Sequence, residues 1–203
     1  MRQAERLETT RTAIVAAATD LFGRQGYGET TMDAIAAAAG VAKGAVYHHF
    51  PTKERLFETV FEATTADLAT HVATAAAAAA DVWDTLSIGT QAYFDACSAG
   101  ATAQIILKDG PAVLGWERWR EIDAAHFGRV MPAVLEAAME QRLIARQPVE
   151  PLARLLLGAV TEAAAACAAS ASPAETGREH AAAFRALIEG LRRSPRPVVG
   201  APT

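Results

Sequence analysis

The segment "GVAKGAVYHHFPTK" at residues 40–53 gathers side chains that could contact a nucleic acid. Lys43, Tyr47 and His48 fall within two turns of a predicted helix, between a glycine and a proline. An ammonium group pairs with phosphate, whereas a phenol or an imidazole donates to phosphate oxygens or base edges. A helix this short cannot form a core by itself, so we expect neighbouring helices to support it and present it outward.

The preceding residues predict two helices that lead into this segment. The first begins at Thr9 or Thr10, and the glycines of "GRQGYG" end it. The second begins at "TTMD", where Thr30 has capping-box spacing to Asp33, and it ends at Gly40, which suits a left-handed cap. A helix, a glycine-containing turn and a second short helix form the helix-turn-helix pattern, whose second helix enters the major groove of DNA.

The stretch "TTMDAIAAAAGVAKGAVYHHFPTKERLF" resembles the DNA-binding signature of TetR-type transcriptional regulators. The resemblance covers residues 8–68, with the helix-turn-helix motif at residues 31–50, and includes Ala-Gly-Val, Lys-Gly, Tyr-His-His-Phe and the Lys-Glu after the proline. It implies an N-terminal domain that binds double-stranded DNA at a palindromic operator. It also implies a larger helical domain, over residues 69–193, that binds a small-molecule effector and forms a homodimer.

Individual residues of the signature have distinct expected roles. Lys43 lies in the first turn of its helix, where the helix dipole disfavours a cation, so contact with phosphate or guanine explains it better than stability does. Gly44 costs about 1 kcal/mol relative to alanine inside a helix, so its expected use is close approach of the backbone to DNA. Ala42 or Ala45 is expected to contact thymine methyl groups. The predicted DNA-contacting residues are Thr30, Thr31, Lys43, Gly44, Ala45, Tyr47, His48 and Lys53, with Thr30, Thr31 and Lys53 included through the resemblance.

The charge of the chain gives no independent support for DNA binding. The formal net charge is −4, and residues 1–60 contain seven Lys or Arg and seven Asp or Glu. The predicted DNA-binding domain is therefore neutral overall, and the local placement of Lys43 and Lys53 must supply the electrostatic contact. A helical small-molecule-binding protein without operator binding is the alternative that this neutrality favours.

The central part of the chain predicts a stripe of aromatic and polar side chains. Trp116, Trp119, Asp123 and His126 recur at helical spacing within one long predicted helix, "WERWREIDAAHFGRVMPAVLEAAMEQRLI". Such side chains can line a pocket for an apolar or aromatic ligand, although packing in the core is the better explanation for any single one of them. The candidate ligand-binding residues are Trp83, Tyr93, Phe94, Cys97, Trp116, Trp119, Asp123 and His126.

The flanking segments complete the predicted second domain. A short helix, "AQIILKDGPAVLG", is expected to break at Gly110 and Pro111. The last two predicted helices, near residues 151–171 and 176–193, each carry an apolar stripe. The resemblance implies that they pair with their copies in a homodimer, and packing within one chain is the alternative. The Pro-rich residues 194–203 predict a disordered tail.

Composition places the chain in the all-α class, with about nine helices. Alanine dominates the apolar share of 51%, and alternating β-branched residues are almost absent. Cys97 and Cys167 are the two cysteines, and their alanine-rich surroundings indicate buried thiols in a reducing compartment. The polar N-terminus and the lack of an apolar run of about 20 residues predict a cytoplasmic protein with no membrane partner. No Glu-x-x-His pair or fixed catalytic spacing occurs, so we expect no enzyme, metal site or cofactor, with a helical enzyme as the weaker alternative.

Overall fold

The structure is a computed structural model that describes residues 2–98 and 100–192, so the predicted tail lies outside the described residues. It is all-α, as predicted. With the continuous run from α6 to α7 counted as one helix, the described residues form nine helices. The elements are α1 (Arg2–Glu29), α2 (Met32–Ala39), α3 (Lys43–His49), α4 (Lys53–Ala76), α5 (Val82–Cys97), α6 (Gly100–Thr102), the π-helix η1 (Ala103–Asp109), α7 (Gly110–Phe127), α8 (Val130–Glu140), α9 (Val149–Ala169) and α10 (Pro173–Glu189).

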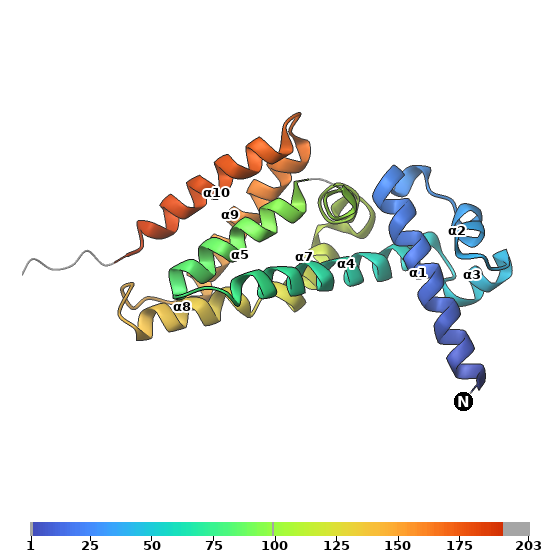
Figure 1. The fold of residues 1–203 in the computed structure, drawn as a ribbon, viewed down its shortest axis with the longest axis horizontal. Helices are drawn as coiled ribbons and strands as arrows, with labels where there is room; N and C mark the ends of the chain where they lie inside the picture. The colour runs from blue at the N-terminus through green and yellow to red at the C-terminus, as the bar shows by residue number, and fades with distance from the viewer. Residues whose placement is uncertain (1, 99, 193–203) are drawn as a thin grey trace, which may run out of the picture.

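The molecule is elongated, with a small three-helix head at one end and a larger helical body at the other (Figure 1). The head comprises α1, α2 and α3, and the body comprises α5 to α10. Helix α4 runs from the head into the body, where it packs against α5 and α7. The predicted domain boundary at residues 68 and 69 therefore falls inside one continuous helix.

Helix α1 is longer than the sequence predicted. It begins at Arg2, and the Thr9 hydroxyl donates to the Glu5 carbonyl within the helix, so neither Thr9 nor Thr10 is its cap. Of the three glycines in "GRQGYG", Gly26 breaks the helix, with φ 81° and ψ 168°. Gly23 stays helical, and Ala101 packs directly on it, where a Cβ atom would overlap the Ala101 Cβ. The glycine-rich segment thus serves as a packing surface and a bend.

The start of α2 corrects a second prediction. Thr31, not Thr30, is the N-cap, and its hydroxyl accepts from the Ala34 amide at 3.1 Å. Thr30 is fully buried, and its hydroxyl donates to the Gly26 carbonyl at 2.8 Å. At the other end of α2, Gly40 adopts the predicted left-handed cap, with φ 67° and ψ 30°. These caps fix the turn that sets α3 against α2.

The core of the head joins it to α4 through large apolar side chains. Phe22 of α1, Ile35 of α2 and Val46 of α3 are fully buried, as are Phe57 and Phe61 of α4. The Phe22 and Phe57 rings meet edge to face at 5.2 Å, a favoured aromatic geometry. Because α3 contributes Val46 and its C-cap residue to this core, its remaining residues lie toward solvent.

The body departs from prediction at two breaks. Gly110 and Pro111 do not interrupt the helix: α7 follows η1 directly, with Pro111 in its first turn. A Cβ atom on Gly110 would lie 2.7 Å from Phe61 and 2.9 Å from Trp119, so only glycine fits this crossing. The long helix predicted from Trp116 onward is instead two helices, α7 and α8, separated at Gly128.

The last two helices pack against each other and against α5. By length and composition, α9 is the one described helix that could cross a membrane, which the sequence had not led us to expect. Core helices of other folds meet the same criterion, so this is weak evidence, and α9 packs here against α8, α10 and η1.

Candidate DNA-binding surface and ligand groove

Helix α3 presents a polar face to solvent and holds its apolar face in the head. Lys43, Gly44 and His48 are exposed, and Tyr47 is 43% exposed, whereas Val46 is fully buried. Thr31 is exposed at the adjoining start of α2, and Ala45 is half-buried. The structure thus brings six of the eight predicted DNA-contacting residues into one surface, which we call the α3 face: Thr31, Lys43, Gly44, Ala45, Tyr47 and His48.

Thr30 is not part of the α3 face. Its side chain is buried and its hydroxyl donates to the Gly26 carbonyl, so the hydroxyl does not face outward, and a contact of Thr30 with DNA stays a prediction. Lys53 is half-buried, and its ammonium donates to the carbonyls of Tyr27 and Thr30 at 2.9 and 3.0 Å. It also lies 4.1 Å from the centre of the Tyr27 ring. Lys53 therefore fastens α4 to the junction of α1 and α2, and its contact with DNA stays a prediction.

Lys43 has an acidic partner that the sequence analysis did not identify. Its ammonium lies 2.7 Å from the Asp33 carboxylate of α2, and both side chains are more than half exposed. The hydrogen bond to Asp33 raises the pKa of Lys43 above its usual value. Exposed pairs of this kind contribute little stability, so a phosphate group can replace Asp33 at little cost. In the free protein, Asp33 holds the lysine on the α3 face.

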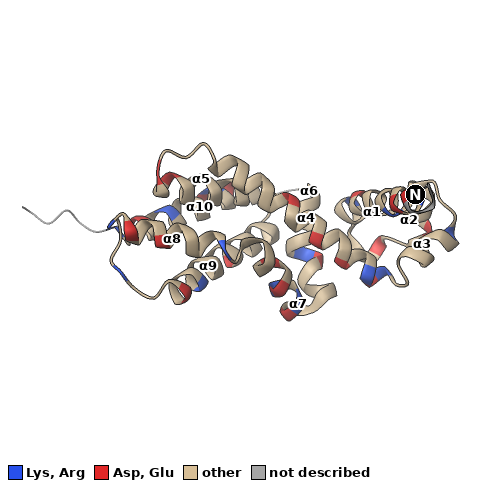
Figure 2. Cartoon of the chain, turned by 90° about the horizontal axis from the view of Figure 1, so that it is seen from below, with Lys and Arg blue, Asp and Glu red and all other residues tan. Residues whose placement is uncertain are grey.

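The charges of the head are mixed, as its composition predicted. Figure 2 shows Lys and Arg interspersed with Asp and Glu over α1 to α4, without a continuous basic strip. Helix α3 ends with His48 and His49, which favour the negative end of the helix dipole. Electrostatic attraction to DNA therefore depends on a few local cations, and contact with two heads at once would double their number.

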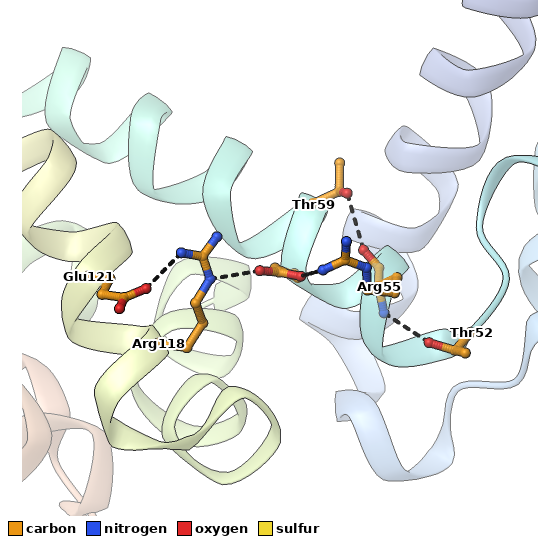
Figure 3. Close-up of polar contacts among 6 residues, drawn as sticks. Thr52, Arg55, Thr59, Arg118 and Glu121 are labelled. Atoms are coloured by element: carbon orange, nitrogen blue, oxygen red, sulfur yellow. Dashed lines mark hydrogen bonds and ion pairs between the residues drawn. The ribbon is translucent and has the colours of Figure 1, made fainter.

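Two polar contacts join α1 and the start of α4 to the body. The guanidinium of Arg118 on α7 lies 2.7 Å from the Glu58 carboxylate of α4, and Arg55, in the first turn of α4, lies 2.7 Å from the other Glu58 oxygen. Figure 3 shows Arg118 between this pair and Glu121 of its own helix. The Arg118 hydrogen bond is the main cause that lowers the pKa of Glu58, which is partly exposed.

The second contact passes through the π-helix. The Asp109 carboxylate at the end of η1 accepts from the Tyr27 amide at 2.8 Å, just after the bend at Gly26. In the same region the Trp119 indole donates to the Ile106 carbonyl of η1 at 2.9 Å. Helix α7 therefore holds α4 directly through Arg118 and reaches α1 indirectly through η1. Displacement of α7 would therefore affect both α4 and α1.

A groove of about 380 Å³ opens between α7 and α9, a size suited to a small organic molecule. One face of α7 forms one wall, with Trp116, Trp119 and Asp123, and one face of α9 forms the other. The Trp116 and Trp119 rings stack in parallel at 5.0 Å, and Trp116 is 54% exposed. The α9 wall, which sequence reasoning missed, comprises Glu150, Ala153, Arg154, Leu157, Gly158, Thr161 and Glu162.

The other predicted ligand residues do not line this groove. Tyr93, Phe94 and Cys97 are buried in the core on α5, and the Tyr93 ring meets Phe127 edge to face at 5.6 Å. Trp83 is buried at the start of α5, with the Arg192 guanidinium 4.7 Å from its ring centre. His126 is half-buried near Asp123. Three of the eight candidates, Trp116, Trp119 and Asp123, therefore meet at one cavity.

Asp123 is the unusual group of the groove. Burial raises its pKa to about 6, against the opposing influence of His126 and Arg120. Its charge also acts on Tyr93 and Cys97 in the core, where burial is the main cause that raises the pKa of both groups, to about 12 for Cys97. Asp123 thus lies between the aromatic core of α5 and the groove.

Comparison with known proteins identifies both parts of the chain. Residues 14–60 match the family model of bacterial regulatory proteins of the tetR family, and residues 83–191 match the tetracyclin repressor-like C-terminal domain. A solved TetR-family transcriptional regulator from Pectobacterium atrosepticum is similar, with a TM-score of 0.83 and 28% identity over 95% of this chain and 98% of that one.

Curated relatives match the chain over different lengths. The transposon Tn10 TetC protein of Escherichia coli is 23% identical over 77% of this chain and 79% of its own length. The regulator AcrR of Shigella flexneri is 44% identical, but over 27% of this chain and 26% of its own length. Because the C-terminal model covers more than half of the chain and the N-terminal model covers the helix-turn-helix, the chain belongs to the TetR family of transcriptional regulators.

Proposed function

We propose that the protein is a homodimeric repressor that binds a palindromic operator through the α3 face and leaves it when a small molecule occupies the body. The observation that carries the proposal is the outward presentation of Lys43, Tyr47 and His48 by a helix whose Val46 is fully buried. A short helix held from behind in this way fits the major groove of DNA. In a dimer, two copies of α3 would read half-sites about 34 Å apart, one turn of the duplex.

The proposed dimer forms through α9 and α10. Leu155 on α9 is 72% exposed and Leu187 on α10 is 51% exposed, although both belong to the apolar stripes of these helices. Exposed leucines on two adjacent helices favour burial against a second copy. Pairing of α9 and α10 with their copies would form a four-helix interface and leave both heads free for DNA.

The effector would act through α7. A small molecule in the groove between α7 and α9 touches Trp119, whose helix also carries Arg118, the partner of Glu58 on α4. Release from DNA requires that the ligand bind the non-binding arrangement of the heads more tightly than the DNA-bound one. A coupling free energy of about 1–3 kcal/mol is typical for such a linkage.

The proposal places the protein in the cytoplasm and assigns it no catalytic step. The alternative, a small-molecule-binding protein whose head does not read DNA, is favoured by the neutral charge of residues 1–60. The two functions differ in one measurable property, specific binding to DNA next to the protein's own gene.

The test is a gel-shift titration with a fragment from upstream of the protein's own gene, repeated at several salt concentrations. Specific retardation by the wild-type protein supports the repressor. The Lys43→Ala protein should bind more weakly and lower the slope of log affinity against log salt by about 1. Asp33→Asn, which frees the same lysine, should bind more tightly. If the wild-type protein binds this fragment no better than unrelated DNA, the alternative function is favoured.

A further inference from the structure

The groove between α7 and α9 has an uneven distribution of charge. Its rim carries two arginines, Arg120 and Arg154, and two glutamates, Glu150 and Glu162, all exposed to solvent. These four formal charges cancel, and each is well hydrated, so the rim attracts neither sign of charge strongly. Asp123 is the remaining ionisable group of the lining, and it is the one that lies largely out of solvent.

The Asp123 carboxylate is not satisfied by the protein. Within the described part of the chain, His126 and Arg120 influence its pKa through charge alone, and neither forms a hydrogen bond or ion pair with it. Asp123 is only partly exposed, and a carboxylate that is partly shielded from water and has no partner is costly to ionise. A ligand that brings a positive charge to this carboxylate removes that cost, whereas a neutral ligand leaves it and an anionic ligand increases it.

The tryptophans next to Asp123 suit the same kind of ligand. Trp119 is almost completely buried and forms the floor of the groove on α7, while the stacked Trp116 keeps half of its surface in solvent. The face of an indole ring attracts cations and apolar groups alike. Ala153, Leu157 and Gly158 of α9 provide an apolar opposite wall.

We propose that the α7–α9 groove binds an organic monocation, an ammonium group attached to an apolar or aromatic body, with the ammonium on Asp123 and the body against Trp116 and Trp119. This inference rests on the proposed effector response and names the chemical class of the effector. Binding would hold α7 at the level of Trp119, one residue from Arg118.

The experiment compares phenethylammonium and benzyltrimethylammonium with the neutral phenethyl alcohol. Binding is followed by tryptophan fluorescence of a Trp83→Phe protein, because Trp83 does not line the groove and would add an unrelated signal. We expect both cations to quench the fluorescence at least about tenfold more tightly than the alcohol, a difference of about 1.4 kcal/mol. Asp123→Asn should remove this preference, and Glu117→Gln, which removes an exposed carboxylate of α7 outside the groove lining, should keep it. Circular dichroism verifies that each variant is folded.

Three results would overturn the inference: no cation binds, the alcohol binds as tightly as the cations, or Asp123→Asn keeps the preference. Cation affinity should also weaken as the pH falls through about 6, because protonation of Asp123 removes its charge; His126, Arg120, Tyr93 and Cys97 are the other ionisable groups coupled to it. Operator binding is measured on the same samples without probe. A protein that binds its operator but no cation contradicts this inference alone, and one that binds cations but no operator contradicts the proposed function alone.

Discussion

At the scale of single residues, the α3 face contains one position that the fold does not require. A Cβ atom on Gly44 would meet nothing within 4 Å, and no left-handed backbone conformation demands glycine there. Glycine inside a helix nevertheless destabilises it by roughly 0.5–1 kcal/mol relative to alanine. The absence of a structural reason supports a role for this bare backbone at the DNA surface.

The Gly44→Ala substitution separates stability from function. We expect it to raise the free energy of unfolding by up to about 1 kcal/mol, since the helix gains and nothing clashes. We expect operator affinity to fall, because the added methyl group holds the backbone away from DNA. Urea unfolding and gel-shift titration measure the two effects. An alanine protein that binds the operator as well as wild type would assign Gly44 no part in recognition.

Asp123 gives a second residue-scale prediction, in the pH dependence of stability. An unfolded aspartate has a pKa of about 3.9, whereas the folded protein raises the pKa of Asp123 to about 6. Between these values the folded state binds more protons than the unfolded state, so ionisation of Asp123 makes folding less favourable as the pH rises. The Asn variant, which cannot ionise, should therefore be the more stable protein at neutral and higher pH.

The size of this effect depends on the shift in pKa. About two pKa units correspond to roughly 3 kcal/mol as an upper value. Thermal midpoints of wild type and Asp123→Asn should differ clearly at pH 8 and much less at pH 5, where the folded wild-type carboxyl is mostly protonated. The other ionisable groups titrate in both proteins, so their contributions to the difference in thermal midpoint cancel. An equal difference at both pH values would show that the carboxyl is already ionised without penalty.

At the scale of elements, α7 links the groove to α4 through Arg118. Arg118→Ala should change the thermal midpoint little, because exposed ion pairs contribute only about 0–1 kcal/mol. Operator affinity should fall by about fivefold, equivalent to about 1 kcal/mol, because the start of α4 would no longer be held to the body. Glu121→Gln is the matched control, since Glu121 contacts Arg118 only within α7. Equal operator affinity of the Arg118→Ala and wild-type proteins would exclude this link.

The sequence predicted the head better than the body, for a physical reason. Capping residues and glycine turns are local signals, so the cap at Gly40 and a short helix between Gly40 and Pro51 were predicted from a few neighbouring residues. Thr30 and Thr31 were distinguished only by burial, which depends on the bend at Gly26. The helix break at Gly128 and the π-helix depend on packing between distant segments, and alanine-rich helices carry little periodic signal.

The sequence also predicted only those parts of the candidate groove that lie close together in the chain. Trp116, Trp119 and Asp123 share one helix face, so their spacing predicted that they lie together. The α9 wall of the groove lies more than 20 residues beyond α7 in the chain, and only the fold brings the two helices together. The partners of Lys43 and Glu58 lie on other helices for the same reason.

At the scale of the whole molecule, the elongated shape places the proposed dimer helices at the opposite end from the heads (Figure 1). Replacing Leu155 and Leu187 together by arginine should yield monomers, because burial of either charge in the interface is unfavourable. Affinity for the full palindrome should fall by about 100-fold, since the second head loses its tether. Light scattering after gel filtration and gel-shift titration measure the two effects.

Val130→Arg is the matched control for this prediction. Val130 is 49% exposed on α8, outside the proposed interface. Its variant should remain a dimer and keep its affinity. A dimeric Leu155→Arg, Leu187→Arg protein would show that another surface joins the subunits.

The π-helix η1 differs from the α-helix that follows it in the number of residues per turn. A π turn contains one residue more than an α turn, and each residue added to or removed from an α-helix rotates the rest of that helix by about 100°. Deleting any one of residues 103–109 would therefore rotate Gly110 away from Phe61, against which it packs. The alanine-rich turn at residues 77–81 contributes no residue to the groove. Insertions and deletions among sequences descended from this gene should therefore occur in that turn and be absent from η1.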